Sequence, residues 1–233
     1  MKKGWIFTFI AVATGFCFAV ASCFVALSLP RAVAQSANMR IVIDAGHGGV
    51  DGGVVGVYSK RKESEINLGI SFLLKDRLTD LGFSVTLTRA TAAGLYDTTA
   101  PGFKRRDMQK RKEICEAASP LLVISVHQNF FPSSSSRGGQ VFYAAADQVA
   151  GAFAASIQGE LNKLYAEQGV KPRTQKTGDY YMLRLSVPSI IVECGFLSNE
   201  KDDQLLNTPS FCVRLSESIV TGVLSEVKNL SAA

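Results

Sequence analysis

The chain of 233 residues contains two histidines, and each follows a short β-branched run. His47 stands in IVIDAGHGG, and His127 stands in LLVISVHQN. If both runs are parallel strands of one sheet, the two imidazoles lie at the carboxyl ends of strands, the edge where open α/β sheets build their sites. Imidazole is a common metal ligand, so the pair predicts a metal site.

A catalytic zinc site uses three protein ligands, and the start of a predicted helix offers two carboxylates for the third position. At about 100° per residue, Glu63 lies within roughly 60° of the apolar positions of this helix, which are Ile66, Ile70 and Leu74. Glu65 lies away from them and suits a first-turn acidic residue that faces water. The helical phase therefore predicts Glu63 as the third ligand.

Glu193 ends the apolar run SIIVE, where an ionised carboxylate is costly to bury without a partner. A paired structural carboxylate is one interpretation, but a strand-end glutamate at this edge of the sheet is better interpreted as a general base. Cys194 points to the opposite side of the strand. Ser125 and Asn129, two residues on either side of His127, are candidates for hydrogen bonds to the metal ligands or to substrate.

Strand-like and helix-like stretches alternate along the chain, which predicts an α/β domain with a mostly parallel, twisted sheet covered by helices on both faces. The predicted strands are residues 40–44, 83–88, 121–127, 140–144 and 189–193. The predicted helices cover about 63–81, 104–118, 146–168 and 201–227.

The N-terminal 34 residues have the pattern of an export segment. Lys2 and Lys3 precede an apolar stretch that ends at Leu29, and the triplet 32–34 reads Ala-Val-Ala. This predicts a cleaved signal peptide, although the apolar stretch is also long enough for an uncleaved membrane anchor. Residues 20–23 resemble a bacterial lipobox, but the apolar FVALSL after them does not suit a lipoprotein. All three alternatives place the domain outside the cytoplasmic membrane, and residues 35–39 would form a short linker.

The net charge of +5 overstates the basicity of the remaining domain. Without Lys2, Lys3 and Arg31, the 25 basic residues fall to 22, against 20 acidic ones. Such a near-neutral domain gives no electrostatic argument for nucleic-acid binding. Beyond the N-terminal segment the three cysteines are widely spaced, which predicts neither a disulfide framework nor a structural zinc site; they are Cys115, Cys194 and Cys212.

Five segments in order carry a resemblance to a known family. The segments IVIDAGHGGVDGG, ESEINL, Thr88-Arg89, SVHQN and PSIIVECGFLSN resemble the zinc-dependent N-acetylmuramoyl-L-alanine amidases of bacterial cell walls. The resemblance covers residues 40–228 and implies a catalytic zinc amidase domain over 40–230. It implies that Zn²⁺ is bound by His47, Glu63 and His127 and that Glu193 is the catalytic glutamate.

The reaction that the resemblance implies is hydrolysis of the amide between the lactyl group of N-acetylmuramic acid and the L-alanine of the stem peptide in peptidoglycan. Zinc would polarise the carbonyl and acidify water, and Glu193 would move the proton to the leaving amine. The segments RGGQVFY, ELNKLY and YYMLRLSVPS resemble the germination-specific amidases, which act in the spore cortex during formation of muramic-δ-lactam.

The spacing between His127 and Glu193 is too short for the autoinhibitory helix of some division amidases, so the resemblance implies regulation from elsewhere, such as a partner protein. Two alternatives remain open. One is a zinc peptidase that cuts within the stem peptide, and the other is a wall-binding module or scaffold without catalysis.

Overall fold

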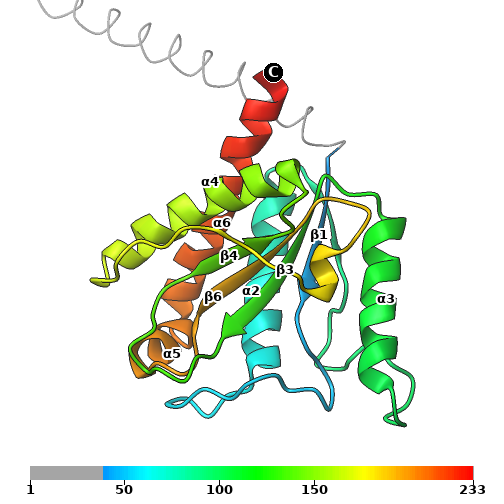
Figure 1. The fold of residues 1–233 in the computed structure, drawn as a ribbon, viewed down its shortest axis with the longest axis horizontal. Coiled ribbons are helices and arrows are strands. Elements are labelled where there is room, and N and C mark those ends of the chain that lie inside the picture. Colours follow the sequence, from blue (N-terminus) through cyan, green and yellow to red (C-terminus); the bar gives the residue numbers. More distant parts are fainter. Residues whose placement is uncertain (1–38, 233) are drawn as a thin grey trace, which may run out of the picture.

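The computed structural model describes residues 39–232, which form one α/β domain (Figure 1). The predicted export segment, residues 1–34, lies outside the described residues, as does all of the predicted linker except Met39. The strands are β1 (Arg40–Ala45), β2 (Ser84–Leu87), β3 (Leu122–Asn129), β4 (Gln140–Tyr143), β5 (Lys176–Thr177) and β6 (Ser189–Phe196). The helices are α2 (Glu63–Asp80), α3 (Phe103–Ala117), α4 (Gln148–Ala166), the 3₁₀ turn η1 (Tyr181–Leu183), α5 (Glu200–Leu206) and α6 (Pro209–Ala232).

The six strands form one sheet in the order β2-β1-β3-β6-β4-β5. All neighbouring pairs are parallel except β4 and β6, which are antiparallel. The prediction of a mostly parallel sheet is confirmed. Because β1, β3 and β6 are adjacent and parallel, their carboxyl ends meet at one edge of the sheet, and the polar residues that follow these strands lie close together.

The two faces of the sheet are covered unequally. One face carries the large core, in which Ile41 and Ile43 of β1 pack with α2, α4 and α6. The other face carries a small cluster around Val42 and Val123, which is covered by Cys115 of α3 and Met182 of η1. Figure 1 shows α3 standing apart from the other helices, on the other side of the sheet. Side chains alternate along a strand, so Ser125 and His127 share the thinly covered face with Val123.

The C-terminal part differs from the prediction of one helix over residues 201–227. The structure has two helices there, because Pro209 begins α6 and the residue before a proline disfavours the helical conformation. The side chain of Asn207 closes α5 by donating to the carbonyl of Asp203 at 2.7 Å. The pattern of β-branched runs also missed the two-residue strand β5 and the turn η1, which are too short to leave a periodic signal.

The three cysteines of the described chain are free thiols, as the prediction of no disulfide framework requires. Burial raises the pKa of Cys115 and Cys194, which makes both thiols unreactive. No helix within residues 39–232 combines the length and the apolar character that crossing a bilayer requires.

Candidate metal centre

The three predicted ligands converge at the carboxyl edge of the sheet, although they come from a loop, a helix and a strand. His47 Nε2 lies 3.3 Å from Glu63 Oε2, and His127 Nδ1 lies 3.0 Å from Glu63 Oε1. One ligand atom from each of the three residues lies within 4.8 Å of the other two. Two imidazole nitrogens and one carboxylate at this separation form a donor set that suits a divalent transition metal such as zinc.

Glu63 is held in place by hydrogen bonds from several directions. The residue is buried at 2% exposure, and its side chain accepts hydrogen bonds from the backbone amides of Val54 and Gln128, both at 3.0 Å. The amide of Asn67, one turn along α2, donates to Oε1 at 3.3 Å. Burial alone would raise the pKa of Glu63, but hydrogen bonds to His127 and His47 outweigh it and hold the pKa well below its usual range. The carboxylate is therefore ionised and oriented, as a metal ligand must be.

Glu65 faces away from this centre, as the helical phase predicts. Half of its side chain is exposed, and it pairs with Arg61 at 3.5 Å on the surface. We expect Glu65→Ala to leave the amount of bound metal unchanged, because an exposed pair of this kind contributes little. Metal content of the purified variant measures this, and loss of metal would contradict the assignment of Glu63 over Glu65.

His47 is oriented by a carboxylate that was not among the predicted site residues. Asp51 Oδ2 lies 3.2 Å from His47 Nδ1 and 3.3 Å from Lys104 Nζ. With Nδ1 donating to Asp51, the lone pair of Nε2 points to the metal position. The sequence signal for Asp51 is its place in GHGGVDGG, four residues after His47 in a loop that turns back on itself through a bridge between Gly48 and Asp51.

The ring of His127 lies against the backbone of Gly46, at the end of β1. A Cβ atom at Gly46 would be 2.3 Å from Cε1 of that ring, so glycine is needed for this approach. Burial lowers the pKa of His127, but the hydrogen bond to Glu63 and the charges of Glu193 and Glu63 outweigh it, and the pKa is raised overall. Without metal, and at a pH below this raised pKa, protonated His127 and ionised Glu63 form an ion pair.

This ion pair predicts a pH-dependent metal affinity. An imidazole binds metal only when neutral, so a metal ion must displace a proton from His127 at any pH below its raised pKa. We expect the metal affinity to fall about tenfold for each unit by which the pH drops below the pKa of His127. Above that pKa the affinity should no longer depend on the protonation of His127. Chelator competition from about pH 5.5 to 8.5 would measure this. A constant affinity across the range would show that metal binding does not displace a proton from His127.

Glu193 lies beside His127, since the two residues are register partners in the β3–β6 pair. Its Oε2 is shielded from solvent and has no hydrogen-bond partner among the described residues. Burial raises its pKa to about 7, since the nearby histidines offset only part of the cost of ionisation. A carboxyl group with such a pKa and an open hydrogen-bonding position beside a metal site can hold or release a proton near neutral pH.

The two remaining candidates lie in different surroundings. Ser125 is fully buried, and its hydroxyl donates to Asp44 Oδ2 at 2.6 Å, so it lies behind the metal ligands and not among them. Asn129 is partly exposed at the end of β3, and its carbonyl accepts a hydrogen bond from the backbone amide of Leu197. A role of Asn129 toward substrate stays a prediction.

Sequence reasoning missed a buried charged cluster beneath the loop that carries His47. Asp44 and Asp107 pair with Arg111 at 2.7 and 2.6 Å, and Arg89 lies beside them. Burial raises the pKa of Asp44, but the charge of Arg111 and hydrogen bonds from Ser125 and Thr88 lower it overall. The available signal was the spacing of Asp107, Arg111 and Cys115, which places charges on the same helix face as a buried thiol.

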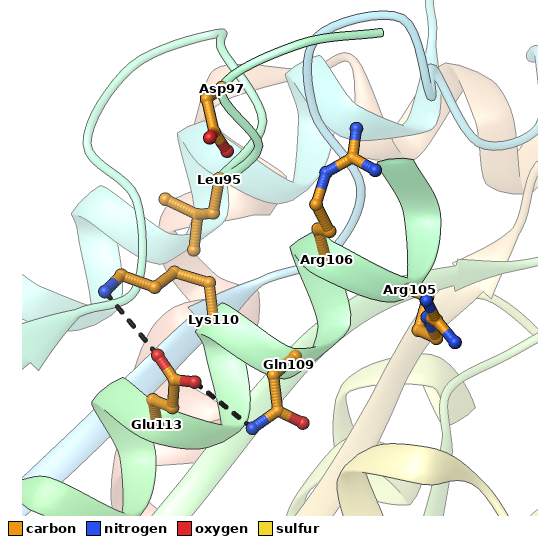
Figure 2. Close-up of a pocket in the computed structure, with 7 residues that line it drawn as sticks. All are labelled: Leu95, Asp97, Arg105, Arg106, Gln109, Lys110 and Glu113. Atoms are coloured by element: carbon orange, nitrogen blue, oxygen red, sulfur yellow. Dashed lines mark hydrogen bonds and ion pairs between the residues drawn. The ribbon is translucent and has the colours of Figure 1, made fainter. Parts of the chain in front are cut away.

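The exposed face of α3 carries a shallow polar depression of about 340 Å³ (Figure 2). Figure 2 shows that Lys110 and Gln109 both interact with Glu113, and that Arg105 and Arg106 project from the same exposed surface. Asp107 and Arg111 of the same helix are buried and do not line the depression. None of the predicted site residues lines the depression, so it is separate from the candidate metal centre.

Comparison with known proteins gives consistent results. The family described as N-acetylmuramoyl-L-alanine amidase matches residues 41–225. The germination-specific N-acetylmuramoyl-L-alanine amidase of Bacillus subtilis is 33% identical over 187 residues, which are 79% of this chain and 78% of that protein.

Solved structures agree with this similarity. The CwlD amidase from Clostridioides difficile, solved in complex with the GerS lipoprotein, superimposes with a TM-score of 0.77 at 31% identity and covers 82% of this chain and 99% of its own. The catalytic domain of CwlV, an N-acetylmuramoyl-L-alanine amidase from Bacillus (Paenibacillus) polymyxa var. colistinus, superimposes with a TM-score of 0.70 at 26% identity, covering 82% and 98% of the two chains.

Proposed function

The chain belongs to the N-acetylmuramoyl-L-alanine amidase family, and from this premise we propose the bond it cleaves, its metal and its catalytic residues. The substrate is peptidoglycan, and the bond is the amide between the lactyl group of N-acetylmuramic acid and the L-alanine of the stem peptide. One observation supports this most strongly: His47, Glu63 and His127 converge beside Glu193, whose shielded Oε2 has no hydrogen-bond partner in the described part of the chain.

We assign zinc to the three converging donors. Nε2 of His47 and the carboxylate of Glu63 face one another at 3.3 Å, and the other ring nitrogen of His47, Nδ1, lies 3.2 Å from the carboxylate of Asp51. When bound, zinc supplies a Lewis acid that polarises the scissile carbonyl and acidifies water. Several divalent ions suit such a donor set, so the choice of zinc rests on the family.

Glu193 is the proton carrier of the proposed reaction. Its carboxylate accepts a proton from the attacking water, and the resulting carboxylic acid donates that proton to the nitrogen of the leaving L-alanine. A pKa near 7 allows both transfers near neutral pH. Oε2 has no hydrogen-bond partner among the described residues, so its lone pairs are free to accept from the reacting water.

We infer that the protein acts outside the cytoplasmic membrane, in the cell wall or spore envelope, with membrane contact only through the N-terminal segment. Within that location we propose the spore cortex and the formation of muramic-δ-lactam. Support comes from the similarity to the germination-specific amidase of Bacillus subtilis and from the three segments that resemble that group. Comparing turnover on cortex peptidoglycan with turnover on vegetative peptidoglycan tests this proposal.

A regulatory partner protein also belongs to this proposal. The similar CwlD amidase was solved in complex with the GerS lipoprotein. A partner of this kind would be detected as a protein that changes turnover or metal loading when it is added to the purified enzyme.

The first experiment is mass spectrometry of the products from purified peptidoglycan, with and without zinc. Intact stem peptides with a free L-alanine amine, released only with zinc, would support the amidase reaction. Cleavage within the stem peptide would identify a peptidase, and wall binding without cleavage would favour a non-catalytic module. Glu193→Ala serves as the inactive control.

A further inference from the structure

Two buried arginines hold the backbone of the loop that carries His47. Arg89 donates from Nε to the carbonyl of Ala45 at 2.8 Å and from Nη2 to that of Gly46 at 3.0 Å. Arg111 donates from Nη1 to Ala45 at 2.7 Å and from Nη2 to the carbonyl of His47 itself at 2.5 Å. Three successive carbonyls thus receive four hydrogen bonds from two planar guanidinium groups, whose donors have a fixed geometry.

The backbone of His47 needs such support. Its φ is 60°, in the left-handed region that a residue with a Cβ atom rarely adopts. Gly48 and Gly49, which follow, also have positive φ and add no restraint of their own. Arg111 donates to the carbonyl of His47 and so holds the peptide group after this left-handed residue, while the ring of His47 faces Glu63.

The charges around Arg111 balance. Asp44 and Asp107 provide two negative charges, and Arg89 and Arg111 provide two positive charges. Replacing a buried ion pair with apolar residues of similar volume is often neutral or stabilising, so stability alone does not account for this cluster. The two arginines of the cluster donate to the backbone carbonyls of residues 45–47, which indicates a role in holding the loop that carries His47.

We propose that Arg111 is a positioning residue for the metal ligand His47 and that, together with Arg89, it sets the affinity of the centre for zinc. This inference rests on the proposed function, since it takes His47 to be a ligand. It makes α3 part of the metal site, although α3 contributes no ligand. Asp107 pairs with Arg111 through one carboxylate oxygen, and its other carboxylate oxygen accepts a hydrogen bond from the backbone amide of Leu95 at 2.5 Å. The loop between β2 and α3 is thereby held to the same charged cluster.

The test is the zinc dissociation constant of the full-length chain in detergent, measured by chelator competition. Arg111→Met is expected to bind zinc at least about tenfold more weakly than the unaltered protein. The double variant Asp107→Asn with Arg111→Met keeps the cluster neutral and should show the same loss. Arg111→Lys restores the charge but not the planar fork, so it should recover thermal stability more than zinc affinity.

Two controls separate positioning from stability. Arg137→Met breaks the ion pair between partly buried Arg137 and buried Asp202 at 2.8 Å, and it should lower the unfolding temperature while zinc affinity stays within about twofold. Arg105→Met lies on the exposed face of α3 (Figure 2) and should change neither quantity. Amide hydrogen exchange at residues 46–49 of the metal-free Arg111 variants should be faster than in the unaltered protein.

The outcomes are distinct. Unaltered zinc affinity in folded Arg111→Met, or in Arg111→Lys if the methionine variants do not fold, would overturn the inference. If the unaltered protein bound no zinc, the metal assignment in the proposed function would fail. Hydrogen exchange in the metal-free protein would then still decide whether Arg111 holds the loop.

Discussion

Replacing Glu193 by glutamine is expected to lower turnover on peptidoglycan by about 10²–10⁴-fold, the usual contribution of a general acid–base group. Glutamine keeps the shape of the side chain but can neither accept the proton of water nor deliver it to the leaving amine. Bound zinc should remain unchanged, because Glu193 lies beside the ligands and not among them. Turnover and metal content, measured on the same preparation, test both parts of this prediction.

Thermal unfolding of the metal-free protein provides the control. Burial raises the pKa of Glu193 to about 7, above the usual value of a glutamate, so the folded state binds a proton that the unfolded state releases. As the pH rises from the usual pKa of a glutamate to about 7, Glu193 therefore lowers the stability of the folded protein. Glu193→Gln does not ionise, so above pH ~7 it should unfold at a higher temperature than the unaltered protein. An inactive variant that is also less stable, or that has lost its metal, would contradict the assigned role.

The ligands were predictable because each stands at a position where a local pattern determines its direction. His47 and His127 follow strand-like runs, and parallel strands bring such residues to one edge. Glu63 and Glu65 differ by two residues on a helix, which is enough to separate a buried side chain from an exposed one. Periodicity of this kind depends on the nearest few residues and needs no knowledge of the tertiary contacts.

The supporting residues were not predictable in the same way. Arg111 lies 64 residues from His47, and the hydrogen bond between them depends on how α3 packs against the sheet. Asp51 is near His47 in sequence, but its contact depends on positive φ at His47 and on the turn that follows. Lys104 and Arg106 at the start of α3 also make contacts that depend on the tertiary fold: Lys104 pairs with Asp51, and Arg106 donates to the carbonyl of Thr98.

The break between α5 and α6, before Pro209, shows a different limit of predicting helices from the sequence. The apolar pattern of the last segment continues across residues 207–208, so periodicity alone predicts one helix where the structure has two. A proline at the first position of a helix is compatible with helical periodicity, and only the conformational restriction on the preceding residue marks the boundary.

The second large effect is expected from a single methyl group. Gly46→Ala leaves all three ligands in the sequence but places a Cβ atom 2.3 Å from Cε1 and 2.4 Å from Nε2 of His127. The backbone of Gly46 cannot easily move away, because its amide donates to Val126 and its carbonyl accepts from Arg89 and Asn67. The ring of His127 must therefore shift, and its nitrogen leaves the position facing Glu63. We expect zinc affinity to fall as far as it does in His127→Ala.

The matched control is Gly159→Ala, the same substitution in α4, where a Cβ atom meets no neighbour within 4 Å. Alanine is favoured over glycine inside a helix by up to about 1 kcal/mol, so this variant should be slightly more stable and should bind zinc normally. Equilibrium dialysis of Gly46→Ala, Gly159→Ala, His47→Ala and His127→Ala compares the four directly. If Gly46→Ala retained full zinc binding while His127→Ala lost it, the ring of His127 would have room to move, and the close approach to Gly46 would not be what positions the ligand.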